Sequence, residues 1–206
     1  MFFKQQPCLD QRSISGDQIC FCTFVDGRRM YGSVPDPDCY ARFLLSEEAG
    51  AGFSNELLWS DTHTYIDLDA PCTLQELGYE LEEFMEAFNE LLIDQFAKHL
   101  GVAIRPSQIL WSNSTRPGKT SFHIKIACDH YWPVADRPCM KDFFRLVNQQ
   151  CLVTKGFHFY TTVDDLLQLN SILDLSVYSA NRCFRSLGCR KPDSTTLAPI
   201  SGAVTH

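Results

Sequence analysis

Residues 64–100 read TYIDLDAPCTLQELGYELEEFMEAFNELLIDQFAKHL and pass from a β-branched, aromatic run into a long amphipathic one. Thr64–Leu68 predicts a strand, because β-branched and aromatic residues favour extended backbone. From Leu74 to Leu100 apolar residues recur every three or four positions, which predicts one continuous helix. Gly101 predicts the end of this helix, since glycine readily adopts the left-handed conformation that closes many helices.

The segments on either side continue the mixture of strands and helices. Ile19–Val25 and Arg29–Val34 surround Asp26-Gly27 and predict a hairpin. A helix capped by Asp36–Asp38 is expected to reach about Glu48. The remaining predicted elements are strands at Ile109–Asn113 and Ser121–Cys128, a helix at Lys141–Val153, and a last strand pair at Leu173–Tyr178 and Cys183–Leu187. This order predicts an α+β fold, with an antiparallel sheet backed by long helices.

Length and composition describe an ordinary globular chain. Its 206 residues are 45% apolar and 21% charged, which suffices for one sizeable domain. No run approaches the roughly 18 apolar residues of a membrane span, and the start lacks the apolar core of a secretory signal. We therefore expect an intracellular protein, in nucleus, cytoplasm, organelle or a viral replication site, without membrane contact. The net charge of −7, from 25 acids and 18 bases, argues against coating nucleic acid by bulk charge, yet permits a local basic site.

Ten cysteines raise the alternatives of disulfides or zinc. They are scattered, no CxxC pair occurs, and only Cys20 and Cys22 lie close together. We interpret them as reduced thiols of the core rather than as a disulfide framework or a metal site.

The first motif is the acidic pair Asp67 and Asp69 on the predicted strand. Residues two apart on a strand point to the same face, so the two carboxylates would repel each other unless a cation lay between them. A pair of Mg²⁺ or Mn²⁺ ions would neutralise them. The alternative is a solvent-facing pair at a strand end.

The second motif is Lys119, Ser121 and His123, which share one face of the next strand, while Phe122 and Ile124 face the core. An ammonium, a hydroxyl and an imidazole on one face suit a polyphosphate. The alternative is a polar edge face without a ligand. The string Gly118-Lys119-Thr120 does not predict a P-loop, because Asn113 stands where the first glycine belongs and a strand-like run follows.

The third motif runs from Asp174 to Lys191. Asp174 lies in an apolar stretch, and a buried carboxylate is costly unless it is paired or bound to metal. From Leu175 to Pro192 there are four bases and no acid, which predicts a cationic hairpin in an acidic protein. Arg182 and Arg185 suit forked contacts with phosphates. The alternative is a solvated basic loop.

Taken in order, these motifs resemble those of the archaeo-eukaryotic primase (primase–polymerase) superfamily, most closely the eukaryotic primase–polymerases and the primases of large DNA viruses. Those proteins share a K-x-S-x-H form of the second motif and a third motif of the form D-x-x-V-Y-x-x-N-R-x-F-R followed by lysine. Here the third motif matches at Asp174, Val177, Tyr178, Asn181, Arg182, Phe184, Arg185 and Lys191. The resemblance spans Tyr65 to Lys191. This chain has Asp-x-Asp where many members have Asp-x-Glu, and Arg28 or Arg29 offers a loose match to a basic strand residue.

The resemblance implies a role for each matching residue. Asp67, Asp69 and Asp174 would be the catalytic carboxylates that hold two Mg²⁺ or Mn²⁺ ions. The residues implied to surround the triphosphate of the incoming nucleotide are Lys119, Ser121, His123, Arg182, Arg185 and Lys191. The implied fold is a primase–polymerase core with an RRM-like antiparallel sheet.

The resemblance also implies an organisation and a function. Residues 1–60 would form a small N-terminal α/β module of the catalytic unit, and 61–192 the catalytic core. The tail at 193–206 is rich in Ser, Thr, Ala and Gly, which predicts a linker leading to further domains. The implied activity is primer synthesis or extension from nucleoside triphosphates on a single-stranded DNA template. A helicase or zinc-binding domain is expected in the same chain or in a partner. A metal-dependent nuclease or phosphohydrolase, and a non-catalytic DNA-binding replisome domain, remain the alternatives.

Overall fold

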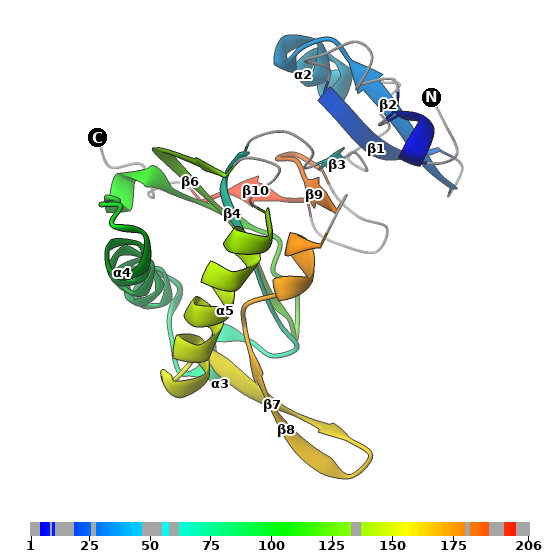
Figure 1. Ribbon diagram of the computed structural model, residues 1–206. Helices are drawn as coiled ribbons and strands as arrows, with labels where there is room; N and C mark the ends of the chain where they lie inside the picture. The colour runs from blue at the N-terminus through cyan, green and yellow to red at the C-terminus, as the bar shows by residue number, and fades with distance from the viewer. Residues whose placement is uncertain are drawn as a thin grey trace. The chain divides into compact units, whose positions relative to one another are not determined.

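The protein has an α+β fold of antiparallel sheets and helices, as predicted (Figure 1). The computed structural model describes residues 5–8, 10, 19–25, 28–46, 55–57, 62–132, 137–179, 182–189 and 196–200. Contacts divide the chain into two compact units. The first comprises Met1–Ser60 with Ala180–Ala198, and the second comprises Asp61–Ser179 with Pro199–His206.

The first unit contains a four-stranded sheet in the order β2-β1-β3-β9. The predicted hairpin is confirmed, with β1 (Ile19–Val25) paired antiparallel to β2 (Arg28–Val34). The short strands β3 (Asn55–Leu57) and β9 (Cys183–Arg185) complete the sheet, and this pairing places the segment after residue 180 with the N-terminal unit. Helix α2 (Pro37–Leu45) begins at the predicted cap, Asp36, and ends earlier than predicted.

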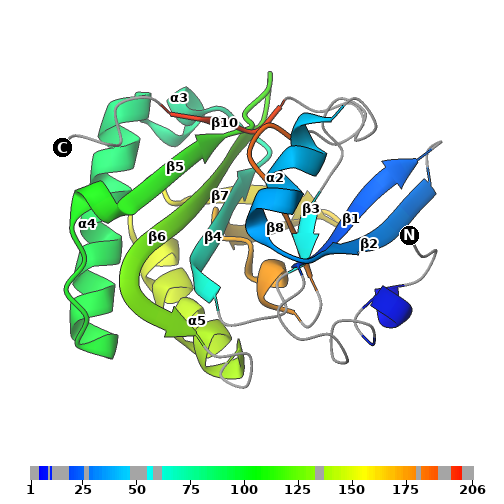
Figure 2. The same cartoon turned by 90° about the horizontal axis from the view of Figure 1, so that it is seen from above.

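The second unit is built on a sheet in the order β10-β5-β6-β4, seen from another side in Figure 2. Its strands are β4 (Thr62–Ala70), β5 (Ile109–Asn113), β6 (Thr120–Trp132) and β10 (Ala198–Pro199). On one face, side chains such as Trp111 and Phe122 pack against Phe84 and Phe88 of helix α4 (Leu81–Leu100). Helix α5 (Arg137–Val153) contacts α4, where Phe143 meets Phe96. The opposite face of the sheet carries the polar residues considered below.

The single helix predicted over Leu74–Leu100 is wrong, because the chain forms two helices there. A capping box of Thr73 and Glu76 starts α3 (Leu74–Leu77). Gly78 then adopts a left-handed φ of 89°, which ends α3 after one turn. The ending of α4 at Gly101, with φ 65°, is confirmed. The apolar spacing continues across the break and therefore conceals it.

The last predicted strand pair is also wrong. Leu175–Tyr178 forms a 3₁₀ helix, η4, and β9 instead pairs with β3, with which it belongs to the first unit. Within the described part of the segment, Leu175–Tyr178 and Cys183–Arg185 therefore do not pair with each other as the expected cationic hairpin requires. The structure has a hairpin earlier in the chain, where β7 (His158–Val163) and β8 (Leu166–Ser171) flank Asp164 and Asp165. A 3₁₀ turn, η2 (Pro106–Gln108), precedes β5.

All ten cysteines lie within the described residues, and all are free thiols. Six of them are buried, in keeping with their interpretation as core residues: Cys8, Cys20, Cys22, Cys128, Cys151 and Cys189. Among the described residues, no helix combines the length and the apolar character that a membrane crossing requires.

Candidate functional site

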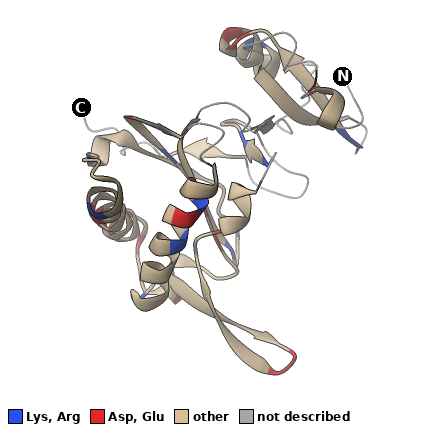
Figure 3. Cartoon of the chain, in the orientation of Figure 1, with Lys and Arg blue, Asp and Glu red and all other residues tan. Residues whose placement is uncertain are grey.

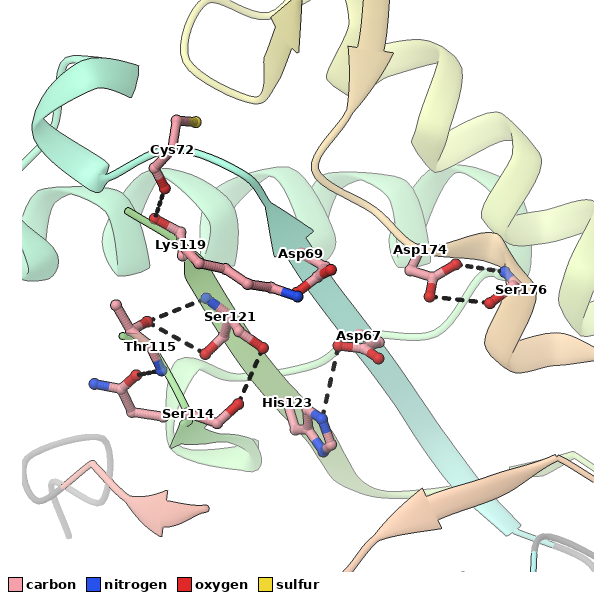
Figure 4. A network of polar contacts seen from close by, with 12 residues as sticks. Asp67, Asp69, Cys72, Ser114, Thr115, Lys119, Ser121, His123, Asp174 and Ser176 are labelled. Carbon is pink, nitrogen blue, oxygen red and sulfur yellow. Dashed lines mark hydrogen bonds and ion pairs between the residues drawn. The ribbon is translucent and has the colours of Figure 1, made fainter. Parts of the chain in front are cut away.

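The two acidic residues of β4 lie directly opposite the polar residues of β6. In the antiparallel register Asp67 pairs with His123, and Asp69 pairs with Ser121. Residues opposite each other in an antiparallel pair share a face of the sheet, so the four side chains gather on one surface (Figure 4). The predicted face-sharing of Asp67 with Asp69, and of Ser121 with His123, is confirmed.

The alternation of apolar residues determines which face becomes polar. Ile66 and Leu68 of β4, and Phe122 and Ile124 of β6, are almost completely excluded from solvent. Because successive strand residues point to opposite faces, burying these four forces the intervening residues onto the other surface. A slip of one residue would exchange the two sets, so the hydrophobic core maintains the register of the site.

The third acid, Asp174, joins from the free edge of β4. Leu173 forms an antiparallel bridge with Leu68, and the amide of Asp174 donates to the carbonyl of Asp67 at 2.9 Å. Its carboxylate accepts from the Ser176 amide at 2.8 Å and from the Ser176 hydroxyl at 3.0 Å (Figure 4). The interpretation of Asp174 as a buried acid is wrong, because its neighbours Ile172 and Leu173 are buried whereas Asp174 is only half-buried and caps η4.

Two tyrosines fasten η4 to β4. The Tyr178 hydroxyl donates to the carbonyl of Tyr65 at 2.9 Å, and the Tyr65 hydroxyl donates to the carbonyl of Val177 at 3.3 Å. Burial, reinforced by Tyr65 and by the charges of Asp67 and Asp174, holds the pKa of Tyr178 well above its usual range. The hydroxyl therefore keeps its proton and remains a donor. This reciprocal contact fixes the chain just after Asp174.

Lys119 reaches the acidic pair from a tight turn. The amide of Lys119 donates to the carbonyl of Arg116, and the amide of Arg116 donates to the carbonyl of Lys119. Gly118, between them, has a left-handed φ of 70°. The Lys119 ammonium lies 2.8 Å from a carboxylate oxygen of Asp69, with both side chains about one-third exposed. A strand rather than a helix follows this turn, which agrees with the rejection of a P-loop.

Ser121 is held by two residues that the sequence analysis did not select, Ser114 and Thr115. The hydroxyls of Ser114 and Ser121 lie 3.0 Å apart. The Thr115 hydroxyl accepts from the Ser121 amide at 3.1 Å and donates to the Ser121 carbonyl at 3.3 Å. They follow β5 in an Asn-Ser-Thr run that resembles an ordinary loop, so only the pairing of β5 with β6 reveals their role.

His123 lies nearly buried between the strands. Its Nε2 atom is 3.7 Å from a carboxylate oxygen of Asp67, and 7% of its side chain is exposed. Two residues further along β6, Lys125 is exposed on the same face, opposite Tyr65. Lys125 is not among the predicted site residues, although the alternation that groups Ser121 with His123 extends to it.

The acidic residues provide oxygen ligands of the kind that Mg²⁺ and Mn²⁺ prefer. Within the described part of the chain, no group of three or more His, Cys, Asp or Glu side chains is arranged to hold a metal ion. The carboxylates of Asp67, Asp69 and Asp174 instead contact His123, Lys119 and Ser176, respectively. The donor set is chemically suited to a divalent cation, and joint coordination would require side-chain rotations away from these contacts.

The remaining predicted site residues belong to the other unit or lie outside the described residues. Arg185 is in β9 with 8% exposure, and Arg182 is exposed just before that strand. Lys191, like Asn181, lies outside the described residues. Six of the predicted residues thus gather on one sheet within the second unit: Asp67, Asp69, Lys119, Ser121, His123 and Asp174.

No protein-family model matches the chain, and no curated protein matches it. The chemistry of the site therefore rests on its own residues.

Proposed function

We propose that the chain is a DNA-templated nucleotidyltransferase of the primase–polymerase kind, which synthesises or extends primers. One observation carries the proposal. The register sets Asp67 and Asp69 against His123 and Ser121, while the segment of Asp174 is hydrogen-bonded to the other edge of the same strand. Acidic residues beside a hydroxyl, an imidazole and a lysine are the groups that phosphoryl chemistry on a nucleoside triphosphate needs.

Lys119, Ser121 and His123 are proposed to bind the triphosphate. Lys119 supplies a charge, and the hydroxyl and the imidazole donate hydrogen bonds to phosphate oxygens. The contacts from Ser114 and Thr115 hold Ser121 in place before a ligand arrives, which reduces the entropy lost on binding. Arg182, Arg185 and Lys191 remain proposed members of this cationic group.

Asp67, Asp69 and Asp174 are proposed to hold two Mg²⁺ or Mn²⁺ ions. When bound, such ions lower the pKa of an attacking hydroxyl and stabilise the charge on the phosphates. The chain's own contribution is to keep three carboxylates on one face, with the register holding two of them and the tyrosine contacts holding the third.

The proposed reaction balances without a covalent enzyme intermediate. The 3′-oxygen of the primer forms a bond to the α-phosphorus, the bond from that phosphorus to the leaving oxygen breaks, and pyrophosphate departs. The proton of the 3′-hydroxyl passes to water. The basic side chains offset negative charge that develops on the leaving pyrophosphate.

The finer description of the fold belongs to the same proposal. A sheet with α4 against one face and a polar opposite face supports a primase–polymerase core with an RRM-like sheet. We propose that residues 1–60 act as the N-terminal module of this catalytic unit. Single-stranded DNA is the proposed template, and a helicase or zinc-binding domain the proposed partner.

The test is nucleotide addition by the purified protein with Mn²⁺, a single-stranded template and labelled nucleotides. Wild-type protein is expected to lengthen or create primers, and Asp67→Asn and Asp174→Asn to abolish the product. Asn at position 174 still accepts a hydrogen bond from Ser176, so η4 keeps its cap. Asp94→Asn, on the exposed surface of α4, is the matched control and should remain active.

The same assay separates the alternatives. Shortening of the DNA, lost in the same variants, would replace the proposal with a metal-dependent nuclease. Binding of DNA without any change in its length would point to a non-catalytic replisome domain. Full activity of both Asp67→Asn and Asp174→Asn would discard the assignment of the acidic residues.

A further inference from the structure

A pocket of about 390 Å³ opens beside the acidic residues. Asp69 and Asp174 form part of its wall, and Asn148 and Leu152 of α5 form another part. Residues of the β7–β8 hairpin, among them Phe159 and Leu169, complete the lining. The volume lies within the roughly 300–1,000 Å³ range of small-molecule sites.

The pocket and two of the proposed triphosphate-binding residues, Ser121 and His123, lie on opposite sides of β4. Ser121 and His123 belong to β6, which pairs with one edge of β4. Asp174 belongs to the segment that bridges the other edge, and the pocket begins there. Across the sheet the order is therefore β6, then the acidic residues of β4, then Asp174 and the pocket.

This order is compatible with in-line displacement at phosphorus. The attacking and leaving oxygens stand on opposite sides of the phosphorus, so the nucleophile must approach from the side away from the pyrophosphate. If the pyrophosphate lies towards Ser121 and His123, the nucleophile approaches from the side of Asp174. We infer that the pocket between α5 and the β7–β8 hairpin binds the 3′-terminal nucleoside of the primer, whose 3′-oxygen attacks.

The lining suits a nucleoside and not another triphosphate. Leu152, Leu169 and Phe159 offer apolar surface to a base, and the described residues that line the pocket include no lysine or arginine. The half-buried amide of Asn148 makes no hydrogen bond to the described part of the chain, so it is available to the edge of a base or to the sugar.

This inference rests on the proposed function, and the chemical step is the same nucleotidyl transfer. The 3′-oxygen of the bound nucleoside forms the new bond to the α-phosphorus, pyrophosphate leaves towards β6, and the hydroxyl proton goes to water. The same pocket would hold the first nucleotide when synthesis begins without a primer. In both cases the pocket requires a nucleotide with a free 3′-hydroxyl, and the number of phosphates on that nucleotide does not matter.

Filling the pocket tests the inference directly. Leu152→Trp places a larger side chain in the lining, and Val153→Trp places the same side chain at the next, 75% exposed position, outside the lining. In primer extension we expect Leu152→Trp to raise the primer concentration for half-maximal rate by about five- to hundredfold, the range of one lost base contact. The nucleotide concentration for half-maximal rate should stay unchanged, and Val153→Trp should match wild type.

A second measurement does not depend on catalysis. A primer ending in 4-thiothymidine, annealed to its template, is irradiated with Asp67→Asn protein, and the attached peptide is identified by mass spectrometry. We expect attachment within residues 148–152 or 159–170. Attachment on another element, or equal behaviour of Leu152→Trp and Val153→Trp in an active enzyme, would overturn the pocket assignment alone. No extension by wild-type protein together with no attachment would overturn the proposed function itself.

Discussion

At the scale of single residues, Asp69 pairs with the Lys119 ammonium and is also a proposed metal ligand, and the two contacts compete. A divalent cation at Asp69 must displace the ammonium that lies 2.8 Å from its carboxylate. Both side chains are about one-third exposed, so the pair contributes no more than about 1 kcal/mol, which corresponds to about fivefold in affinity. We expect Lys119→Met to bind Mn²⁺ up to about fivefold more tightly, measured by calorimetry without nucleotide.

The same variant should bind a nucleoside triphosphate more weakly, because it loses a positive charge. Lys98→Met on the exposed face of α4 is the control and should change neither affinity. Mn²⁺ affinity that falls in Lys119→Met would contradict the expected competition between the ammonium and the ion at Asp69.

The cysteines offer a residue-scale test of the fold. Burial raises the pKa of Cys151 to about 12, so almost none of it is thiolate at pH 8. Cys139, near the start of α5, is exposed. We expect iodoacetamide to modify Cys139 at least about a hundredfold faster than Cys151, followed by peptide mass spectrometry. In urea the two rates should become similar, and equal rates in the folded protein would contradict the burial of Cys151.

Much of the site could be predicted at this scale, because side-chain alternation on strands is a local property. The two acids of β4 and the pair Ser121 and His123 follow from it directly. Ser114 and Thr115 could not be predicted, since their contacts to Ser121 depend on the pairing of β5 with β6. The prediction that Asp174 is buried is wrong for a related reason, because apolar neighbours in sequence do not determine whether a residue caps the start of a helix or enters a strand.

At the scale of elements, glycines set the limits of the helices. Gly156, in the turn from α5 to β7, has a φ of 83°, and a β-carbon there would lie 2.2 Å from Tyr79 Cε2. Gly78 has a similar φ of 89° with nothing within 4 Å of a β-carbon. Gly78→Ala should therefore cost only the left-handed conformation, about 1–2 kcal/mol.

Gly156→Ala adds a steric conflict to the same conformational cost. We expect it to lower the free energy of unfolding by about 1–3 kcal/mol more than Gly78→Ala does, measured by urea denaturation. Tyr79 also stacks on Phe157 and donates to the carbonyl of Lys155, so its ring cannot move aside freely. Equal losses in the two variants would mean that the contact with Tyr79 does not constrain the turn.

Elements with a clear local sequence pattern were predicted, and elements without one were missed. Helix α4, with an apolar residue at every third or fourth position, was predictable to its last residue. The β7–β8 hairpin was missed because its turn is Asp164-Asp165, at φ 49° and 63°, instead of a pair containing glycine. Strand β8 also contains no β-branched residue. The pairing of β9 with β3 joins segments far apart in the chain, which no local pattern reveals.

At the scale of the whole molecule, acidic and basic residues are concentrated at different places. The chain carries a net charge of −7, yet Lys119 and Lys125 mark the polar face of β6. The tip of the β7–β8 hairpin is acidic, because Asp164 and Asp165 lie between the two strands (Figure 3). A polyanionic template is therefore attracted only locally and is repelled by much of the remaining surface.

This distribution predicts a shallow dependence of template binding on salt. Each phosphate neutralised by a cation contributes about −0.7 to the slope of log affinity against log salt for single strands, so Lys119 and Lys125 alone give a slope of about −1.4, and even twice as many cations would give only about −3. We expect no steeper slope for single-stranded DNA between about 50 and 200 mM KCl, the interval over which phosphate contacts are usually resolved. Lys125→Met should make the slope shallower by the contribution of about one phosphate contact, and Lys98→Met should leave the slope unchanged. A slope near −6 or steeper would require far more phosphate contacts than the polar face of β6 offers, and would place the template on a different surface.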